Sequence, residues 1–305
     1  MNSAGRALLV LPVAVFLLQC IVLRGSSLSE EGNAATRSDD VENPLVILDA
    51  LIQAYPDKVE SLEIREGDWS ILIGGVPYFW AGGRMLPGAE RVNAEKYSPY
   101  HFFPYPRNLP PLTVFTTDEL KELEAMIERR EARTDFRFTG FLKALWGMGD
   151  FLSAEEHVVR MEFLGSRIRI HPDIREALEN VEVSILRIAE TDTDTARWLE
   201  NLRESGAYVW RDIAGSANRS LHSYGIAIDL IPKDYHGKQA YWRWAADFID
   251  EWWDIPYTSR FQIPQEVIGA FEEQGFIWGG KWLLFDQIHF EYRPELIILG
   301  EYAGE

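Results

Sequence analysis

Two short segments near the C-terminal end carry residue types and spacings that favour metal chemistry. The first, residues 220–230, reads SLHSYGIAIDL. In a strand over 225–230 the large apolar side chains would face a core, whereas Gly225, Ala227 and Asp229 would form an open floor on the other side. His222 precedes this strand and can turn its imidazole toward that floor. A histidine and an aspartate at this spacing are also common as hydrogen-bonded structural residues, so this segment alone does not indicate a site.

The second segment, residues 285–294, reads FDQIHFEYRP and repeats the alternation. His289 and Glu291 would face away from the core, and Asp286 can reach the same side from the turn that enters the strand. With His222 and Asp229, His289 would complete the three protein ligands of a catalytic zinc site, which leaves the fourth position to water. Asp286 would be the general base for that water. Glu291 would either orient a ligand imidazole or be an exposed strand residue.

Both segments resemble a known family of zinc peptidases. Residues 220–229 match the Ser-x-His-x-x-Gly-x-Ala-x-Asp motif of the VanY-like D-alanyl-D-alanine carboxypeptidases at every fixed position, and residues 286–289 are similar to their closing Asp/Glu-x-x-His motif. An aspartate at the acidic position, followed by Phe-Glu after the histidine, resembles the branch that contains the L-alanyl-D-glutamate endopeptidases. The resemblance implies one zinc ion held by His222, Asp229 and His289, with Asp286 as the catalytic base. It covers residues 175–300.

The resemblance also implies polar groups that contact the substrate. In this family an arginine upstream of the histidine motif steadies the carbonyl oxygen or a substrate carboxylate. Arg211, just after an expected strand at 207–210, fits that place, and Arg219 is the alternative. Ser220, the first residue of the motif, is implied in substrate contact. Trp278 or Trp282, which flank two glycines just before the second segment, could form a wall of the site.

The surrounding pattern predicts the elements that must position these residues. Asn43-Pro44 favours a helix start, Gly74-Gly75 a hairpin turn, and Thr116 with Glu119 a capping box before a helix to residue 133. Residues 97–111 are too rich in proline and aromatics for a helix or a central strand. Further helices are expected at 173–190, 193–204, 239–253 and 264–274, a helical turn at 153–156, a hairpin at 158–170, and strands at 207–210, 225–230, 276–279 and 288–293.

This order of elements predicts an α+β fold, in which a small antiparallel sheet with flanking helices carries the His-Asp-His site. The resemblance implies that this is the hedgehog-like zinc fold. Residues 43–170 are predicted to form an N-terminal mixed region of unknown role, and residues 171–305 the zinc peptidase domain.

The amino-acid composition limits which partners and which kinds of metal site are possible. The chain has 305 residues, with 30 Lys and Arg against 48 Asp and Glu, a net charge of −18 and a sequence pI near 4.8. Such an acidic surface repels a phosphate backbone, which argues against nucleic acid as a partner. The single cysteine, Cys20, excludes a disulfide framework and a cysteine-based zinc site.

The N-terminal residues favour export. Arg6 followed by the apolar run 7–23 is typical of a signal peptide or membrane anchor over residues 1–24. Residues 17–20 resemble a lipobox with Gln19 where a small residue is usual, so the alternatives are lipidation of Cys20, cleavage near Ser26, and an uncleaved anchor. Residues 25–42 are predicted to be a disordered tether. Each alternative places the folded part in the periplasm or outside the cell, with the membrane contacted only through the N-terminal segment.

These features lead to one main hypothesis and two alternatives. The main hypothesis is an exported zinc metallopeptidase that hydrolyses peptidoglycan stem peptides, acting as a D-alanyl-D-alanine carboxypeptidase or as an endopeptidase. The first alternative is a non-catalytic, zinc-stabilised binding module on the same fold. The acid at Asp286 argues against it, because a structural zinc site needs no base. A wall-anchored structural lipoprotein would explain the N-terminal segment but not the ligands. The sequence does not predict the oligomeric state.

Overall fold

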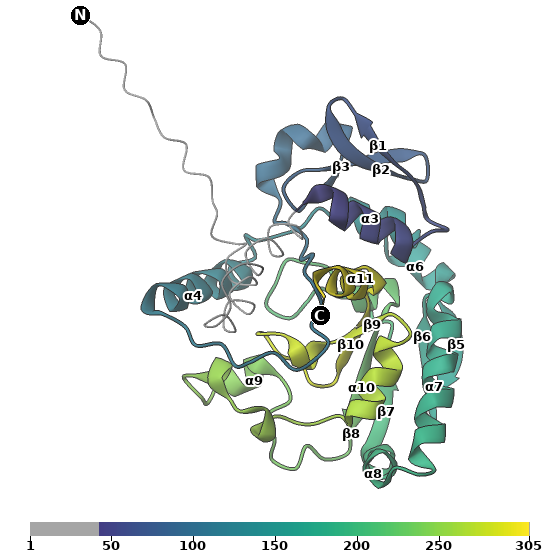
Figure 1. Cartoon of the computed structure of the whole chain (residues 1–305), viewed down its shortest axis with the longest axis vertical. Coiled ribbons are helices and arrows are strands. Elements are labelled where there is room, and N and C mark those ends of the chain that lie inside the picture. Colours follow the sequence, from purple (N-terminus) through teal and green to yellow (C-terminus); the bar gives the residue numbers. More distant parts are fainter. Residues whose placement is uncertain (1–42, 305) are drawn as a thin grey trace, which may run out of the picture.

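A computed structural model describes residues 43–304, in which three small antiparallel sheets are surrounded by helices (Figure 1). The expected α+β class is confirmed, and the hedgehog-like fold stays a prediction. The predictions on residues 1–42, including the one on Cys20, lie outside the described residues. Within residues 43–304, every helix is too short or too polar to span a membrane.

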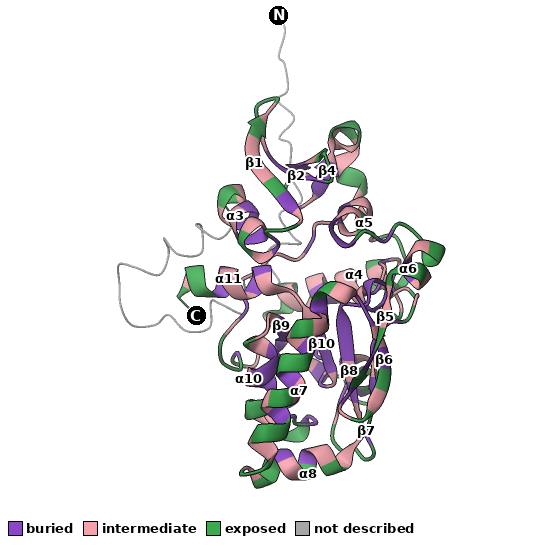
Figure 2. Ribbon diagram, turned by 90° about the vertical axis from the view of Figure 1, so that its right-hand side faces the viewer, coloured by how far each residue is buried: buried purple, intermediate pink, exposed green. Residues whose placement is uncertain are grey.

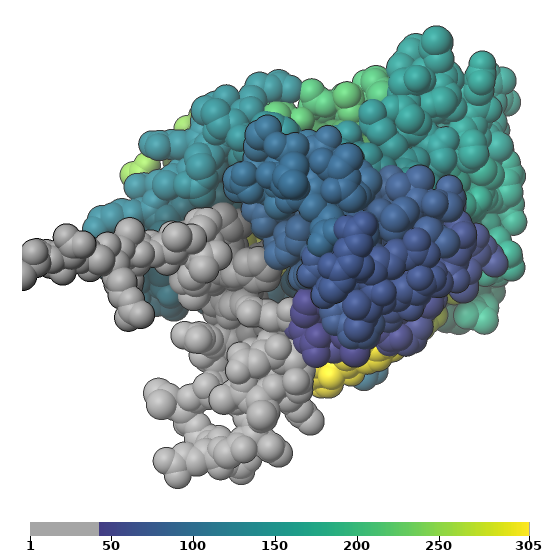
Figure 3. Space-filling model, turned by 90° about the horizontal axis from the view of Figure 1, so that it is seen from above, coloured from purple at the N-terminus to yellow at the C-terminus, as the bar shows by residue number. Residues whose placement is uncertain are grey.

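The N-terminal part is a helix and a four-stranded antiparallel sheet. Asn43 caps the helix and Pro44 begins it, as expected, and the Gly74-Gly75 hairpin turn is confirmed. The elements are α3 (Pro44–Ala54), β1 (Val59–Arg65), β2 (Asp68–Ile73), β3 (Val76–Trp80), β4 (Met85–Pro87) and the 3₁₀ segment η1 (Gly88–Lys96), with sheet order β1-β2-β3-β4. Figure 3 shows this part, in purple and blue, covering one end of the molecule beside the yellow C-terminal residues.

The middle of the chain supplies helices and a separate hairpin. The capping box of Thr116 and Glu119 is confirmed at the start of α4. The helical turn expected at 153–156 lies within α6, which begins two residues earlier because Asp150 caps it. The elements are α4 (Thr117–Glu131), α5 (Gly140–Trp146), α6 (Phe151–His157) and the paired strands β5 (Val159–Phe163) and β6 (Ser166–Ile170).

The C-terminal part is a four-stranded antiparallel sheet of order β7-β8-β10-β9. Its helices are α7 (Arg175–Ala189), α8 (Thr193–Asn201), α9 (Trp242–Ala246), α10 (Gln265–Glu272) and α11 (Pro294–Ala303). Its strands are β7 (Leu202–Gly206), β8 (Ala227–Pro232), β9 (Phe276–Trp278) and β10 (His289–Tyr292). The 3₁₀ turns are η2 (Pro172–Ile174), η3 (Leu221–Tyr224), η4 (Trp252–Asp254), η5 (Tyr257–Ser259) and η6 (Gly279–Lys281).

The prediction of a strand at 207–210 is wrong. β7 ends at Gly206, and the next amide groups bond to unrelated partners instead of one neighbouring strand. Tyr208 N donates to Arg169 O, whereas Val209 N donates to His222 O. The segment is therefore an extended connection that spans two parts of the fold.

The helix expected over 239–253 is shorter than predicted. Only α9 is α-helical within it, and the chain then folds back on itself before the 3₁₀ turn η4. The rings of Trp242 and Trp252 lie 5.0 Å apart, whereas ten residues of continuous α-helix would separate them by about 15 Å. Aromatic packing therefore overrides the helical periodicity here.

The proline- and aromatic-rich residues 97–111 form an irregular, ordered segment, as expected. Tyr105 N donates to Leu296 O, and the Tyr105 hydroxyl donates to Glu272. The buried Lys281 ammonium donates to the Pro106 and Arg107 carbonyls and pairs with Glu272 at 2.7 Å. These bonds hold the segment against α10 and α11.

One continuous hydrophobic core joins the N-terminal and C-terminal parts. α3 packs on α11, and the Tyr55 hydroxyl donates to the buried Glu295 at 2.6 Å. Figure 2 shows β8 and β10 buried at the centre of this core. The division into regions 43–170 and 171–305 stays a prediction.

His171 lies at this predicted boundary and is buried as a neutral side chain. Its Nε2 donates to Trp146 O at 2.9 Å, and its Nδ1 accepts from Asp173 N at 3.1 Å. Burial lowers the pKa of His171 to about 4. A second proton, on Nδ1, would also be unfavourable because Nδ1 already accepts a hydrogen bond from Asp173 N. The imidazole of His171 is therefore a structural group.

Candidate metal centre

The pairing of β8 with β10 brings the predicted ligands together. Asp229 on β8 lies directly opposite His289 on β10. The adjacent Ile228 and Phe290 pair with each other and are fully buried. Because successive strand residues point to opposite faces, Asp229 and His289 face away from this core.

His222 reaches the same point from η3, the turn that precedes β8. The Ser220 hydroxyl accepts a hydrogen bond from His222 N and caps this turn. Gly225 ends the turn with φ +65°, and a Cβ there would lie 2.5 Å from the backbone nitrogen of His171, so only glycine fits. β8 consequently begins at Ala227, two residues later than expected.

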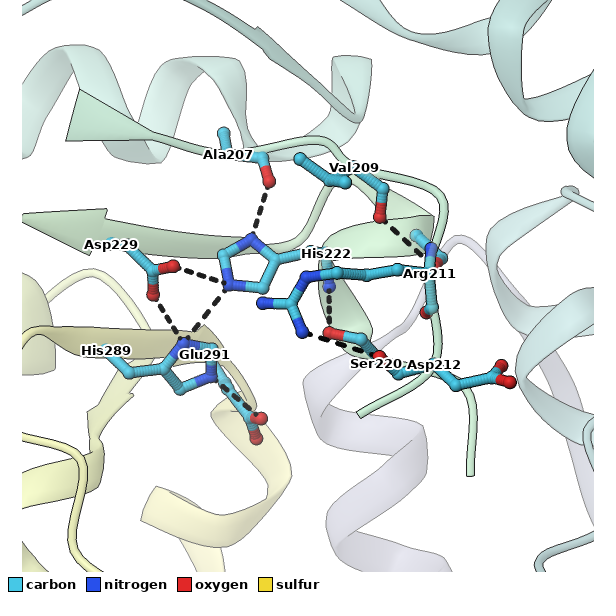
Figure 4. Close-up of polar contacts among 10 residues, drawn as sticks. Ala207, Val209, Arg211, Asp212, Ser220, His222, Asp229, His289 and Glu291 are labelled. Atoms are coloured by element: carbon cyan, nitrogen blue, oxygen red, sulfur yellow. Dashed lines mark hydrogen bonds and ion pairs between the residues drawn. The ribbon is translucent and has the colours of Figure 1, made fainter. Parts of the chain in front are cut away.

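The three side chains converge, as Figure 4 shows. The two oxygens of Asp229 lie 3.2 Å from His222 Nε2 and 2.8 Å from His289 Nδ1. The two imidazole nitrogens are 3.3 Å apart, and one ligand atom from each residue lies within 4.8 Å of the others. The group could therefore hold a metal ion.

Hydrogen bonds on the outer side of each imidazole fix which nitrogen faces the centre. His222 Nδ1 lies 2.5 Å from the Ala207 carbonyl, which can only accept, so Nδ1 carries the hydrogen. His289 Nε2 lies 3.1 Å from the Glu291 carboxylate, which likewise needs a donor. His222 Nε2 and His289 Nδ1 are thus the nitrogens that face Asp229, and each could offer a lone pair to a cation bound there. Two imidazole lone pairs and a carboxylate are the donor set of a divalent cation such as zinc.

The electrostatics of the group support this conclusion. Burial alone would raise the pKa of Asp229, but His222 and His289 outweigh it and hold that pKa below its ordinary range. Burial opposes the charged form of His289, yet its hydrogen bonds to Asp229 and Glu291 raise its pKa well above the usual value. The site therefore stabilises positive charge at its centre, which a cation can supply in place of a proton.

Asp286 lies on the turn before β10 and is not among the ligating residues. Its Oδ1 is buried and accepts no hydrogen bond from residues 43–304. Burial raises the pKa of Asp286 to about 6, opposed by the charge of His289 and reinforced by that of Asp229. A carboxylate with a free oxygen and such a pKa can accept a proton near neutral pH.

Residues 214–292 match the D-alanyl-D-alanine carboxypeptidase family. The match confirms the resemblance found in the two segments, and it contains His222, Asp229, Asp286 and His289. Residues 47–102 match a family described as a domain of unknown function. No solved structure matches the chain.

The two candidate arginines of the carboxypeptidase resemblance differ in their contacts. Arg219 pairs with Asp212 at 3.1 Å and lies over the Trp210 ring. Arg211 is exposed, and its guanidinium donates only to the Asp212 carbonyl among the described residues. Figure 4 shows the Arg211 side chain directed back toward His222. These contacts leave Arg211 free to meet another group, whereas Arg219 is already engaged.

The remaining predicted residues surround the centre in different ways. Glu291 is partly buried against His289 and is not an exposed strand residue. Trp282 packs edge-on against the His289 ring with centroids 5.7 Å apart, whereas Trp278 is fully buried in the core. Ser220 is buried and caps η3; its contact with substrate stays a prediction.

Sequence reasoning missed the Ala207 carbonyl that orients His222. Neither the identity of Ala207 nor its distance along the chain signals this role, because the interaction uses the backbone. The extended connection after β7 passes beside η3, and only that placement brings the carbonyl to Nδ1.

Proposed function

We propose that this protein is a zinc metallopeptidase that hydrolyses peptidoglycan stem peptides. The observation that carries the proposal is the convergence of His222 Nε2, Asp229 and His289 Nδ1. The charges of these residues act on Asp286, whose buried Oδ1 accepts no hydrogen bond from the described residues. All four residues lie in the segment that matches the D-alanyl-D-alanine carboxypeptidase family.

The metal would be held by His222, Asp229 and His289. When bound, zinc lowers the pKa of a coordinated water and polarises the scissile carbonyl. Glu291 holds the His289 ring with its Nδ1 toward Asp229, and the Ala207 carbonyl likewise holds His222 with its Nε2 toward Asp229, so that both nitrogens could bind the metal.

Asp286 is proposed as the catalytic base. Its carboxylate takes the proton from the attacking water and delivers it to the amine of the leaving group. The buried, unshared Oδ1 and the raised pKa both support this role. Arg211 is proposed to donate two N–H groups to the developing oxyanion or to a substrate carboxylate, and Ser220 to contact the substrate.

The test compares Asp286→Asn with Asp247→Asn, which changes an exposed aspartate. With zinc-loaded protein and purified muropeptides, Asp286→Asn should lower the rate of amine release by ~10²–10⁴-fold while the bound zinc stays at one equivalent. Asp247→Asn should act like the natural sequence. Full activity in Asp286→Asn would remove it as the base, and zinc binding without any product would favour the non-catalytic binding module.

The proposal allows two cleavage sites, the D-alanyl-D-alanine linkage and the L-alanyl-D-glutamate linkage. Mass spectrometry of the products decides between them, because loss of one terminal alanine differs from cleavage within the stem. Export is proposed from residues 1–24, and N-terminal sequencing together with a radioactive fatty acid tests cleavage and lipidation at Cys20.

A further inference from the structure

A cavity of about 60 Å³, lined in part by charged side chains, lies beside the metal centre. Both predicted regions line it: Tyr100, Arg137 and Phe141 on one side, and Glu291 and Arg293 on the other. Since Glu291 also bonds to His289 Nε2, the cavity begins one side chain from a proposed zinc ligand. Its volume suits a group of a few heavy atoms.

Arg137 places a positive charge at this cavity. Its Nε is buried without a hydrogen bond, and its guanidinium forms no ion pair within residues 43–304. Burial lowers the pKa of Arg137, with only partial relief from Tyr100 and Glu291. A guanidinium in such surroundings is costly unless an anion meets it.

The other charged groups at the cavity already have partners. Arg293 bonds to Glu295, which also accepts from the Tyr55 hydroxyl. Glu291 is engaged by His289, and Arg219, which also lines the cavity, pairs with Asp212. The acidic residues of the cavity are therefore committed elsewhere, and Arg137 remains free to bind a ligand.

Hydrogen bonds with Asn218, in the segment that matches the carboxypeptidase family, hold the backbone of Arg137 in place. The buried Asn218 side chain accepts from Arg137 N at 2.7 Å and donates to Asp135 O at 3.2 Å. Asn218 stands two residues before Ser220, within the part that matches the carboxypeptidase family. The loop that carries Arg137 is thus anchored to the segment that supplies His222.

We propose that this cavity is a carboxylate subsite, in which Arg137 binds a carboxylate of the substrate peptide next to the scissile bond. The proposal rests on the proposed peptidase function and gives a role to the region before residue 171. A guanidinium presents parallel N–H groups that match the two oxygens of a carboxylate, and the apolar walls of Tyr100 and Phe141 strengthen that pairing.

The experiment uses a synthetic stem pentapeptide and a panel in which one carboxylate at a time is replaced by its amide. Zinc-loaded protein is compared with Arg137→Gln, Arg137→Lys and the matched control Arg129→Gln, an exposed arginine on α4. Binding of the same peptides is measured by calorimetry on the Asp286→Asn background, so that it does not depend on turnover.

One amide should lower kcat/KM of the natural protein by ~10- to 100-fold, the range of a charge-assisted hydrogen bond. Arg137→Gln should lose that discrimination, Arg137→Lys should keep part of it, and Arg129→Gln should keep all of it. Discrimination that persists in Arg137→Gln would overturn the subsite and leave the peptidase function intact.

The calorimetric binding measurement can support the subsite even if the peptidase function is wrong. Arg137-dependent binding of the carboxylate peptide without cleavage would support the subsite and refute the peptidase. If the peptides bind to Arg137→Gln as tightly as to the protein with Arg137, or bind to neither protein, the subsite is wrong.

Discussion

Replacing Gly225 by alanine is expected to destabilise the fold and weaken the metal centre. Gly225 has φ +65°, and an L-residue in this left-handed conformation costs about 1–2 kcal/mol. The added Cβ would lie 2.5 Å from His171 N and 2.9 Å from the carbonyl carbon of Ile170. Since both are backbone atoms, the strand must move.

That movement threatens the hydrogen bond from His171 N to Gly225 O, which is 2.8 Å long and contributes about 1 kcal/mol. Together the two terms give a loss of about 2–3 kcal/mol, which corresponds to a fall in Tm of roughly 4–6 °C for a folded part of this size. His222 belongs to the same turn, so zinc affinity should fall as well.

Gly237→Ala is the matched control. Gly237 has φ +69°, but a Cβ there meets nothing within 4 Å, so only the conformational cost applies. Urea unfolding followed by tryptophan fluorescence, and zinc competition with a chelator, should place Gly225→Ala at least about 1 kcal/mol below Gly237→Ala. Equal losses in the two variants would refute the close-approach argument.

Three further predictions concern Glu291 beside the centre and two buried groups elsewhere in the fold, His171 and Lys281. Glu291→Gln should weaken zinc binding ~10- to 100-fold by chelator competition, because His289 loses its charged acceptor; unchanged affinity would contradict this. Because burial lowers the pKa of His171 to about 4, its contribution to the free energy of unfolding is complete above pH 6.5 and is lost as the pH falls toward 4, by about 3 kcal/mol. His171→Gln should flatten that part of the pH–stability profile, and an identical profile would be evidence against a neutral buried imidazole. Lys281→Met leaves Glu272 without its buried partner and should cost about 3 kcal/mol in urea unfolding, whereas a loss below 1 kcal/mol would show that the pair is not structurally required.

The metal ligands could be predicted because their signal is local. Alternation in residues 225–230 and 288–293 places Asp229 and His289 on the face opposite the core, and the structure pairs them directly. The strand expected at residues 207–210 is absent, because the backbone groups there bond to Arg169 and His222 and not to one neighbouring strand. Period-two patterning describes the faces of a strand, but not whether a neighbouring strand is present.

Elements whose ends depend on tertiary packing were predicted less well. The aromatic residues of 239–253 fit a helical period, yet α9 ends at Ala246 and the chain folds back so that Trp252 packs on Trp242. β1, β4 and α11 were not predicted, although α11 packs on α3 from the opposite end of the chain. Contacts between residues so far apart leave no pattern in either segment.

The sequence by itself determined the ligand types and their spacing, because each depends on residues within one turn and one strand. The close approach that requires glycine at 225 comes from the tertiary structure, because it brings the backbone of His171 and Ile170 against this position. Only the tertiary structure decided which nitrogen of His222 faces the metal, since the Ala207 carbonyl reaches Nδ1 through the long-range course of the chain. It also decided that Arg137 stands at the cavity beside Glu291, since Asn218 anchors its loop across 81 positions of the sequence. Hydrogen bonds between distant segments form only after the core has brought those segments together.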